Sequence, residues 1–225
     1  MMKTQAVSEI VNSLGYLLSI PSDGSLSDLP LLVYLHGAGE RGTDLSHLTR
    51  HAVPRLVAEG KDFPAVILCP QCPVEYVWDN IVDRVKALID RIAAQYSIRK
   101  DRICLTGSSM GGFGTWMLAM TYPNFFSAIA PVAGGGMSWR CGNLRSTPVY
   151  AVHGDCDEAV PYVYTRMLSD ALQTAGADVR CRVLTGSGHN DGIEKAYEET
   201  DMIEWLLAQR RTDFTAVPET CSEWF

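Results

Sequence analysis

The chain has 225 residues, of which 47% are hydrophobic, and its formal net charge is −7. This length and composition predict one domain over residues 1–225, with a single large core. The negative charge argues against nucleic acid or an anionic membrane surface as a partner, and no apolar run approaches the roughly 20 residues of a membrane-spanning helix.

Short apolar runs predict the strands of a mostly parallel sheet that is covered on both faces. The predicted strands are Leu31–Leu35, Ala65–Cys69, Ile103–Thr106, Ala128–Val132, Val149–Val152 and Val179–Leu184. An earlier run, Leu14–Ile20, is a candidate antiparallel strand at the edge of the sheet, and a turn signal at residues 21–24 ends it.

Helical patterns alternate with these strands. The predicted helices are Ile81–Gln95, Gly112–Thr121, Tyr162–Thr174 and Glu194–Gln209. Repeated β-then-α units predict an α/β fold, with a right-handed, mostly parallel sheet and helices on both of its faces. Residues 210–225 show no clear periodicity, and Trp224 and Phe225 in this tail either pack onto the domain or remain free of it.

The N-terminus and the cysteines bear on the compartment of the protein. Residues 1–10 contain one lysine and no apolar core of the kind that a secretory signal has. Seven cysteines, an odd number, are scattered through the apparent strands and loops, which is typical of reduced thiols, so we expect a cytoplasmic protein. Cys69 and Cys72 form a C-x-x-C pair, but no second pair or histidine stands near it, and we expect no metal and no other cofactor.

The sequence Gly107-Ser108-Ser109-Met110-Gly111 places Ser109 at the centre of a G-x-S-x-G pattern. A predicted strand precedes this pattern and a predicted helix follows it, which is the context of a nucleophile elbow. Glycines on both sides remove Cβ atoms where the turn is tightest. The alternative is an ordinary loop rich in serine and glycine, because the pattern alone often occurs by chance.

A serine nucleophile needs a base, which is usually a histidine oriented by a carboxylate. In this fold the order along the chain is serine, then the acid, then the histidine. Three of the five histidines precede Ser109, and His153 comes just before the best acid candidates. His189, in a glycine-rich loop, is the histidine that fits the order. The acid is expected after the strand at 149–152, where position alone does not separate Asp155, Asp157 and Glu158.

Two backbone N–H groups are expected to bind the negative charge that develops on the substrate oxygen. One belongs to Met110, directly after the nucleophile. The other is expected from Ala38, in the loop that follows the first predicted parallel strand, where Gly37 and Gly39 let the backbone approach a substrate. In the same loop we expect His36 to shape the backbone, and we expect Glu40 and Arg41 to pair with each other or to contact substrate.

Together these blocks resemble the α/β-hydrolase superfamily, and more narrowly its small serine esterases of the phospholipase/carboxylesterase-like or predicted-peptidase group. The matching blocks are residues 35–42, 69–73 with Trp78, 101–112, 153–161 and 188–189. The family's H-G-x-x-D-x-x-V-P block, laid over residues 153–161, implies Asp157 as the acid. The resemblance also implies that Trp78 stands where such proteins often line the acyl pocket, with a buried structural tryptophan as the equal alternative. No long insertion follows the sixth strand, so we expect no large cap and an open site.

We therefore expect a serine carboxylesterase whose partner is a small-molecule ester with a short acyl or aryl group. A thioesterase or a peptidase would use the same residues. Dienelactone hydrolase is a nearby alternative, but its nucleophile is a cysteine, and position 109 is serine. A non-catalytic binding protein with this fold typically lacks a member of the triad, and none is obviously missing here. The sequence does not indicate the oligomeric state.

Overall fold

The computed structural model of the protein describes residues 1–8, 14–22 and 28–215. Its centre is an eight-stranded sheet in the order β1-β2-β4-β3-β5-β6-β7-β8. The strands are β1 (Met2–Val7), β2 (Tyr16–Pro21), β3 (Leu31–Leu35), β4 (Val66–Pro70), β5 (Ile103–Ser108), β6 (Ala128–Val132), β7 (Val149–Gly154) and β8 (Val179–Leu184). Pairing is parallel from β4 to β8, whereas β1 and β2 join through antiparallel pairs.

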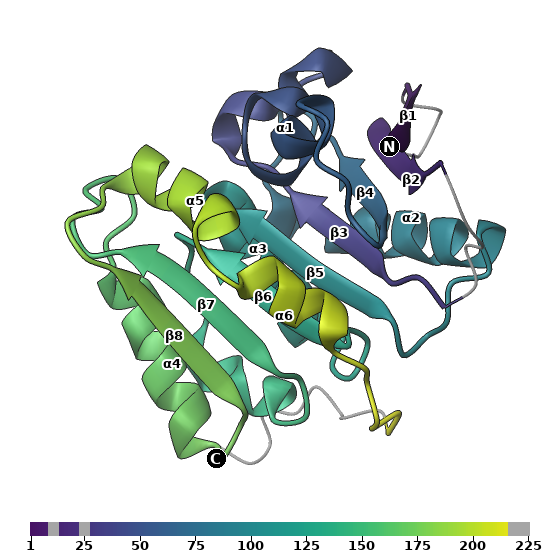
Figure 1. Ribbon diagram of the computed structural model, residues 1–225. Helices are drawn as coiled ribbons and strands as arrows, with labels where there is room; N and C mark the ends of the chain where they lie inside the picture. Colours follow the sequence, from purple (N-terminus) through teal and green to yellow (C-terminus); the bar gives the residue numbers. More distant parts are fainter. Residues whose placement is uncertain (9–13, 23–27, 216–225) are drawn as a thin grey trace.

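Helices cover both faces of the sheet (Figure 1). The α-helices are α1 (Ala52–Ala58), α2 (Val82–Gln95), α3 (Met110–Thr121), α4 (Val163–Thr174), α5 (His189–Glu198) and α6 (Met202–Ala208). Short 3-10 helices are η1 (Ala38–Glu40), η2 (Leu45–Arg50), η3 (Trp78–Asn80) and η4 (Ser138–Leu144). In Figure 1, α5 and α6 cross the front of the sheet, and α4 lies behind it. The α/β prediction is therefore confirmed.

The core consists of two layers because successive residues of a strand point to opposite faces. From β3, Leu31, Val33 and Leu35 pack in the layer that α2, α3 and α4 cover. Leu32 and Tyr34 pack in the other layer, beneath α1, α5 and α6. Burying one large aliphatic side chain contributes about 1.5–3 kcal/mol, so β3, buried along its whole length, is a strong anchor for the loop that follows it.

Two sequence predictions about the elements are wrong. The run predicted as an edge strand is antiparallel, but β2 is an inner strand because β1 pairs with its outer side. The helix predicted over Glu194–Gln209 is two helices, α5 and α6, separated by Glu199-Thr200-Asp201, and α5 begins five residues earlier, at His189. The proposed packing of Trp224 and Phe225 lies outside the described residues.

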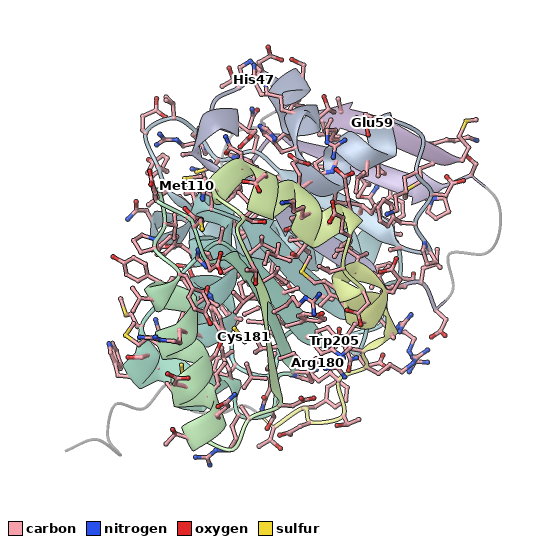
Figure 2. The ribbon with its side chains drawn as sticks, turned by 60° about the vertical axis from the view of Figure 1, so that its left-hand side comes forward. His47, Glu59, Met110, Arg180, Cys181 and Trp205 are labelled. Atoms are coloured by element: carbon pink, nitrogen blue, oxygen red, sulfur yellow. The ribbon has the colours of Figure 1, made fainter. Side chains whose placement is uncertain are left out.

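The opposite edge of the sheet is β8, where Arg180 and Arg182 are exposed. The Arg180 guanidinium lies 5.3 Å from the centre of the Trp205 ring, and Figure 2 shows this pair well away from Met110. Charged side chains on an edge strand oppose pairing with another sheet.

Among the described residues, every helix is too short or too polar to cross a bilayer.

Candidate active site

The turn between β5 and α3 forces Ser109 into a strained backbone conformation. Its φ is 56° and its ψ is −120°, a region that non-glycine residues rarely adopt. The glycines around it are required by close backbone contacts. A Cβ on Gly107 would lie 2.4 Å from the Gly111 carbonyl oxygen, and one on Gly111 would lie 1.8 Å from the Leu35 oxygen. The G-x-S-x-G residues thus form a sharp turn that presents Ser109 at the end of the sheet.

Ser109, His189 and Asp157 form a hydrogen-bonded chain. The Nε2 atom of His189 lies 2.9 Å from Ser109 Oγ, and its Nδ1 atom lies 2.6 Å from Asp157 Oδ2. The carboxylate can only accept, so Nδ1 carries the proton, and Nε2 is free to accept the hydroxyl proton of Ser109. Asp157 is completely buried, while His189 keeps 21% of its side chain exposed.

The three candidate acids have different surroundings. Asp157 Oδ1 accepts the backbone N–H groups of Ala159 and Val160 at 2.9 and 2.8 Å, which fixes the carboxylate and leaves Oδ2 to His189. Asp155 instead accepts the N–H of Gly186 at 2.7 Å. Glu158 is exposed. Asp157 is the one of the three that contacts the imidazole.

The loops carrying Asp157 and His189 are held together by close backbone contacts. A Cβ on Gly154 would lie 2.3 Å from the Ser187 carbonyl oxygen, so this position requires glycine. The same oxygen accepts the N–H of Cys156 at 3.0 Å. Together with the bond between Asp155 and Gly186, which are 31 residues apart in the chain, these contacts join the two loops directly.

A second histidine, His153, lies behind the acid and is fully buried. Its Nε2 atom donates to the Val160 carbonyl at 2.8 Å and lies 3.3 Å from Asp157 Oδ2, while Nδ1 lies 2.7 Å from the Thr165 hydroxyl. Burial lowers the pKa of His153 below its ordinary value. The ring is therefore a neutral support for the loop that carries Asp157.

The two predicted oxyanion donors lie on either side of Ser109. Met110 is the first residue of α3, where helix N–H groups have no partner within the helix. Ala38 is in η1, directly after β3, and lines the same pocket as Ser109 and His189. Within the part of the chain that the structure describes, neither backbone N–H has an acceptor. Gly37 and Gly39 also line this pocket, as predicted for residues that approach a substrate.

Trp78 does not line the pocket, so the prediction that it contacts the acyl group is wrong and the alternative of a buried structural tryptophan holds. Only 1% of Trp78 is exposed, and it fills the space beside Gly114, where a Cβ would lie 2.5 Å from the Trp78 Cβ. Its indole N–H donates to the His36 carbonyl at 2.9 Å. The tryptophan therefore supports the loop after β3 from below.

Of the two alternatives for Glu40 and Arg41, the mutual ion pair is wrong, whereas a substrate contact stays a prediction for Glu40, which lines the pocket. Arg41 donates to the Ala38 carbonyl at 3.1 Å and to the Val74 carbonyl at 3.3 Å, which ties two loops together. Glu40 turns inward, with its carboxylate 3.7 Å from His36 and 3.6 Å from His51.

The pocket in front of Ser109 has a volume of about 270 Å³. Its lining residues are Gly37, Ala38, Gly39, Glu40, His51, Ser108, Ser109, His189, Asn190, Ile193 and Glu194. Sequence reasoning missed His51, Asn190 and Glu194. Asn190 and Glu194 are four residues apart on α5 and so share a face, but this signal was hidden by starting the helix at residue 194. Among the described residues, no group of three His, Cys, Asp or Glu side chains is placed to hold a metal ion, in this pocket or outside it.

The sheet order, the strained serine turn and the Ser–His–Asp contacts define an α/β-hydrolase. The family model for phospholipase/carboxylesterase matches residues 73–201, and the chain belongs to this family. The resemblance inferred from the sequence is thereby confirmed.

Individual relatives are esterases or depolymerases. The chain is 43% identical over 63 residues to poly(3-hydroxyalkanoate) depolymerase C of Paucimonas lemoignei, covering 28% of this chain and 15% of that protein. It is 28% identical over 138 residues to a bifunctional acetylxylan esterase/xylanase of Neocallimastix patriciarum, covering 59% and 20%. The crystal structure of a thermostable esterase has a TM-score of 0.79 and 29% identity, covering 93% of this chain and 63% of that one. The chain thus spans a minor part of the length of both curated relatives.

Proposed function

We propose that this protein is a serine carboxylesterase that hydrolyses esters with short acyl or aryl groups through an acyl-enzyme on Ser109. The observation that carries the proposal is the continuous hydrogen-bonded chain from Ser109 Oγ through His189 to Asp157. A buried, ionisable chain of this kind is the arrangement that activates a serine hydroxyl. Membership of the phospholipase/carboxylesterase family and the likeness to a thermostable esterase support it.

In the first half of the reaction, Ser109 Oγ attacks the ester carbonyl carbon and its proton passes to His189 Nε2. The Asp157 carboxylate stabilises the imidazolium that forms. The carbonyl oxygen becomes negative and accepts from the N–H groups of Ala38 and Met110, each of which lowers the barrier by about 3–4 kcal/mol. The C–O bond to the alcohol then breaks, and the alcohol leaves with the proton from His189.

In the second half, water takes the place of the alcohol. His189 removes a proton from the water as its oxygen attacks the acyl carbon, and the same oxyanion donors hold the intermediate. Collapse of the intermediate breaks the bond to Ser109 Oγ, which recovers its proton from His189, and releases the carboxylic acid.

Steady-state hydrolysis of p-nitrophenyl acetate tests this function. The wild-type protein should hydrolyse this ester, and Ser109→Ala should lower kcat by about 10⁴–10⁶-fold. The neighbouring Ser108→Ala is the control, because among the described residues the Ser108 hydroxyl is hydrogen-bonded to Tyr34 at 2.9 Å, whereas His189 is hydrogen-bonded to Ser109. Turnover by Ser109→Ala near the wild-type rate would refute the assignment.

A further inference from the structure

The pocket in front of Ser109 has one charged wall that the proposed triad does not use. This wall consists of Glu40, from the loop after β3, with His51 and Glu194. Only 8% of the Glu40 side chain is exposed, and within the described residues its Oε2 atom is buried with no hydrogen-bond partner. Its nearest ionisable neighbour is His36 Nδ1, 3.7 Å away, so this buried oxygen is held by an electrostatic contact without a hydrogen bond, which is costly for a buried carboxylate.

The other groups of the wall are already occupied by one another. His51 Nδ1 lies 2.9 Å from Glu194 Oε1, and Arg55 donates to Glu194 Oε2 at 2.8 Å. Arg55 also bonds to Glu59 and Glu198. This leaves Glu40 Oε1 as the acceptor in the pocket with capacity to spare, since His51 Nε2 approaches it only to 3.6 Å and Oε2 is buried beside His36.

The Glu40 carboxylate is ionised and lies close to the nucleophile. Burial raises its pKa, but His36 and His51 beside it outweigh burial and hold this pKa below its ordinary value. A Cβ placed on Gly37 would lie 3.3 Å from Glu40 Oε2 and 3.6 Å from Ser109 Cβ. Only one glycine therefore separates the carboxylate from the serine.

The position of the wall indicates which part of an ester would meet it. Under the proposed function, His189 delivers its proton to the departing alcohol, so the alcohol oxygen lies beside His189 Nε2. The pocket is lined from His189 along α5 through Asn190 to Glu194, where His51 contacts Glu194 on one side and Glu40 on the other. The alcohol part of the ester, rather than the acyl part, therefore faces these groups.

We propose that Glu40 and His51 form a subsite that binds hydroxyl groups on the alcohol part of the substrate, so that esters of small polyhydroxylated alcohols are preferred. This inference rests on the proposed esterase function. Hydroxyls donate and accept, which matches a wall of carboxylate, imidazole and amide. The volume of about 270 Å³ suits a small alcohol. A quaternary ammonium group would need aromatic faces, and none of the described lining residues is Phe, Tyr or Trp.

Four acetates with three-carbon alcohols test the subsite, because their acyl groups are identical. They are propyl acetate, glyceryl 1-acetate, 3-acetoxypropionate and 3-acetoxypropyl-trimethylammonium. In the wild-type protein, kcat/KM should be at least about tenfold higher for glyceryl than for propyl acetate, as one charge-assisted hydrogen bond provides. The anionic ester should be the slowest, because Glu40 repels it.

Glu40→Gln should lower the glyceryl-to-propyl ratio by about tenfold and should raise the relative rate of the anionic ester. His51→Gln, at a half-exposed residue, should lower the same ratio and does not alter a buried charge. Glu199→Gln, at an exposed residue directly after α5, is the matched control and should leave all ratios unchanged.

Three outcomes would overturn the inference. If the glyceryl-to-propyl ratio of kcat/KM in Glu40→Gln and His51→Gln equals that in Glu199→Gln, the subsite does not exist, while the esterase function stands. A wild-type preference for the trimethylammonium ester, lost in Glu40→Gln, would make this a cation site instead. Failure of the wild-type protein to hydrolyse any of the four acetates or p-nitrophenyl acetate would refute the esterase function together with the subsite.

Discussion

His36 donates its Nδ1–H to the carbonyl oxygen of Gly37 over 2.5 Å. The other ring nitrogen, Nε2, accepts the backbone N–H of Cys72 at 2.9 Å, which leaves Nδ1 as the nitrogen that carries the proton. The Gly37 carbonyl and the Ala38 N–H belong to one planar peptide unit and point in opposite directions. By fixing the carbonyl, His36 thus aims the Ala38 N–H, the proposed oxyanion donor, and it does so without contacting the substrate.

His36→Gln should therefore weaken catalysis more than binding. A glutamine cannot satisfy both Gly37 and Cys72, so the Ala38 N–H loses its fixed direction. We expect kcat for p-nitrophenyl acetate to fall by about 10–100-fold, which is part of the cost of losing an oxyanion donor, with KM changed by less than about threefold. His47→Gln, at a histidine outside the pocket lining, is the control. A kcat equal to that of the control would show that His36 does not position the donor.

The acid can be identified by comparing Asp157 with Asp155, two residues before it in the chain. Asp157→Asn should lower kcat/KM by about 10⁴-fold, because an amide no longer stabilises the His189 imidazolium or selects its tautomer. Asp155→Asn should keep most of the activity, since an amide oxygen still accepts the N–H of Gly186. The opposite ranking in an aryl ester assay would transfer the acid role to Asp155.

The close contacts between the loops that carry Asp157 and His189 predict an effect of substituting Gly154, which does not contact the substrate. In Gly154→Ala, the new Cβ would lie 2.3 Å from the Ser187 oxygen and must displace the loop that carries His189. A shift of about 1 Å in a catalytic group costs roughly 10²-fold in rate, so we expect a loss of kcat of that size. Gly142→Ala is the matched control, because a Cβ there meets nothing within 4 Å. Equal kcat values in Gly154→Ala and Gly142→Ala would show that the contacts between the two loops do not position His189.

Most of the sheet was predictable because its inner strands are buried on both faces and their apolar runs are continuous, as in β3 and β6. The exception is β1, whose sequence Met-Lys-Thr-Gln-Ala-Val lies at the edge with its central residues exposed, so no apolar pattern marks it. The break between α5 and α6 was also hidden, because Glu199-Thr200-Asp201 contains neither glycine nor proline.

For the site, chain order is enough to select His189, because the order of the family excludes the other histidines. Side-chain direction is what the sequence could not supply. Glu40 and Arg41 are adjacent in the chain but point to different neighbours, the imidazoles for one and backbone carbonyls for the other. The direction of the Trp78 side chain was equally unpredictable, because its position in a motif does not tell whether the indole faces the pocket or the core, where it lies.

Stability should depend on pH through His153. Burial lowers its pKa in the folded protein, whereas the unfolded chain takes up a proton near pH 6.5. The unfolded state thus binds more protons as the pH falls below about 6.5, and the free energy of unfolding decreases there by up to about 1.4 kcal/mol per pH unit. Above about pH 6.5 the stabilisation that neutral His153 contributes to the folded state is fully present.

His153→Gln isolates this dependence in urea unfolding at pH 7.5 and pH 5. The variant should be less stable at pH 7.5 by about 1–3 kcal/mol, because buried partners such as Thr165 lose their hydrogen bond. Its further loss between pH 7.5 and pH 5 should be smaller than that of the wild-type protein. Identical losses in the two proteins would mean that His153 is not the buried neutral group described above.

The most direct test of the proposed Ser109 nucleophile is covalent labelling with a fluorophosphonate, followed by mass spectrometry of the peptides. We expect stoichiometric phosphonylation of Ser109, no label on Ser108, and labelling at least about 10³-fold slower in His189→Ala, since the hydroxyl is then not activated. Label on another residue, or labelling of Ser109 at an unchanged rate without His189, would refute Ser109 as a nucleophile activated by His189.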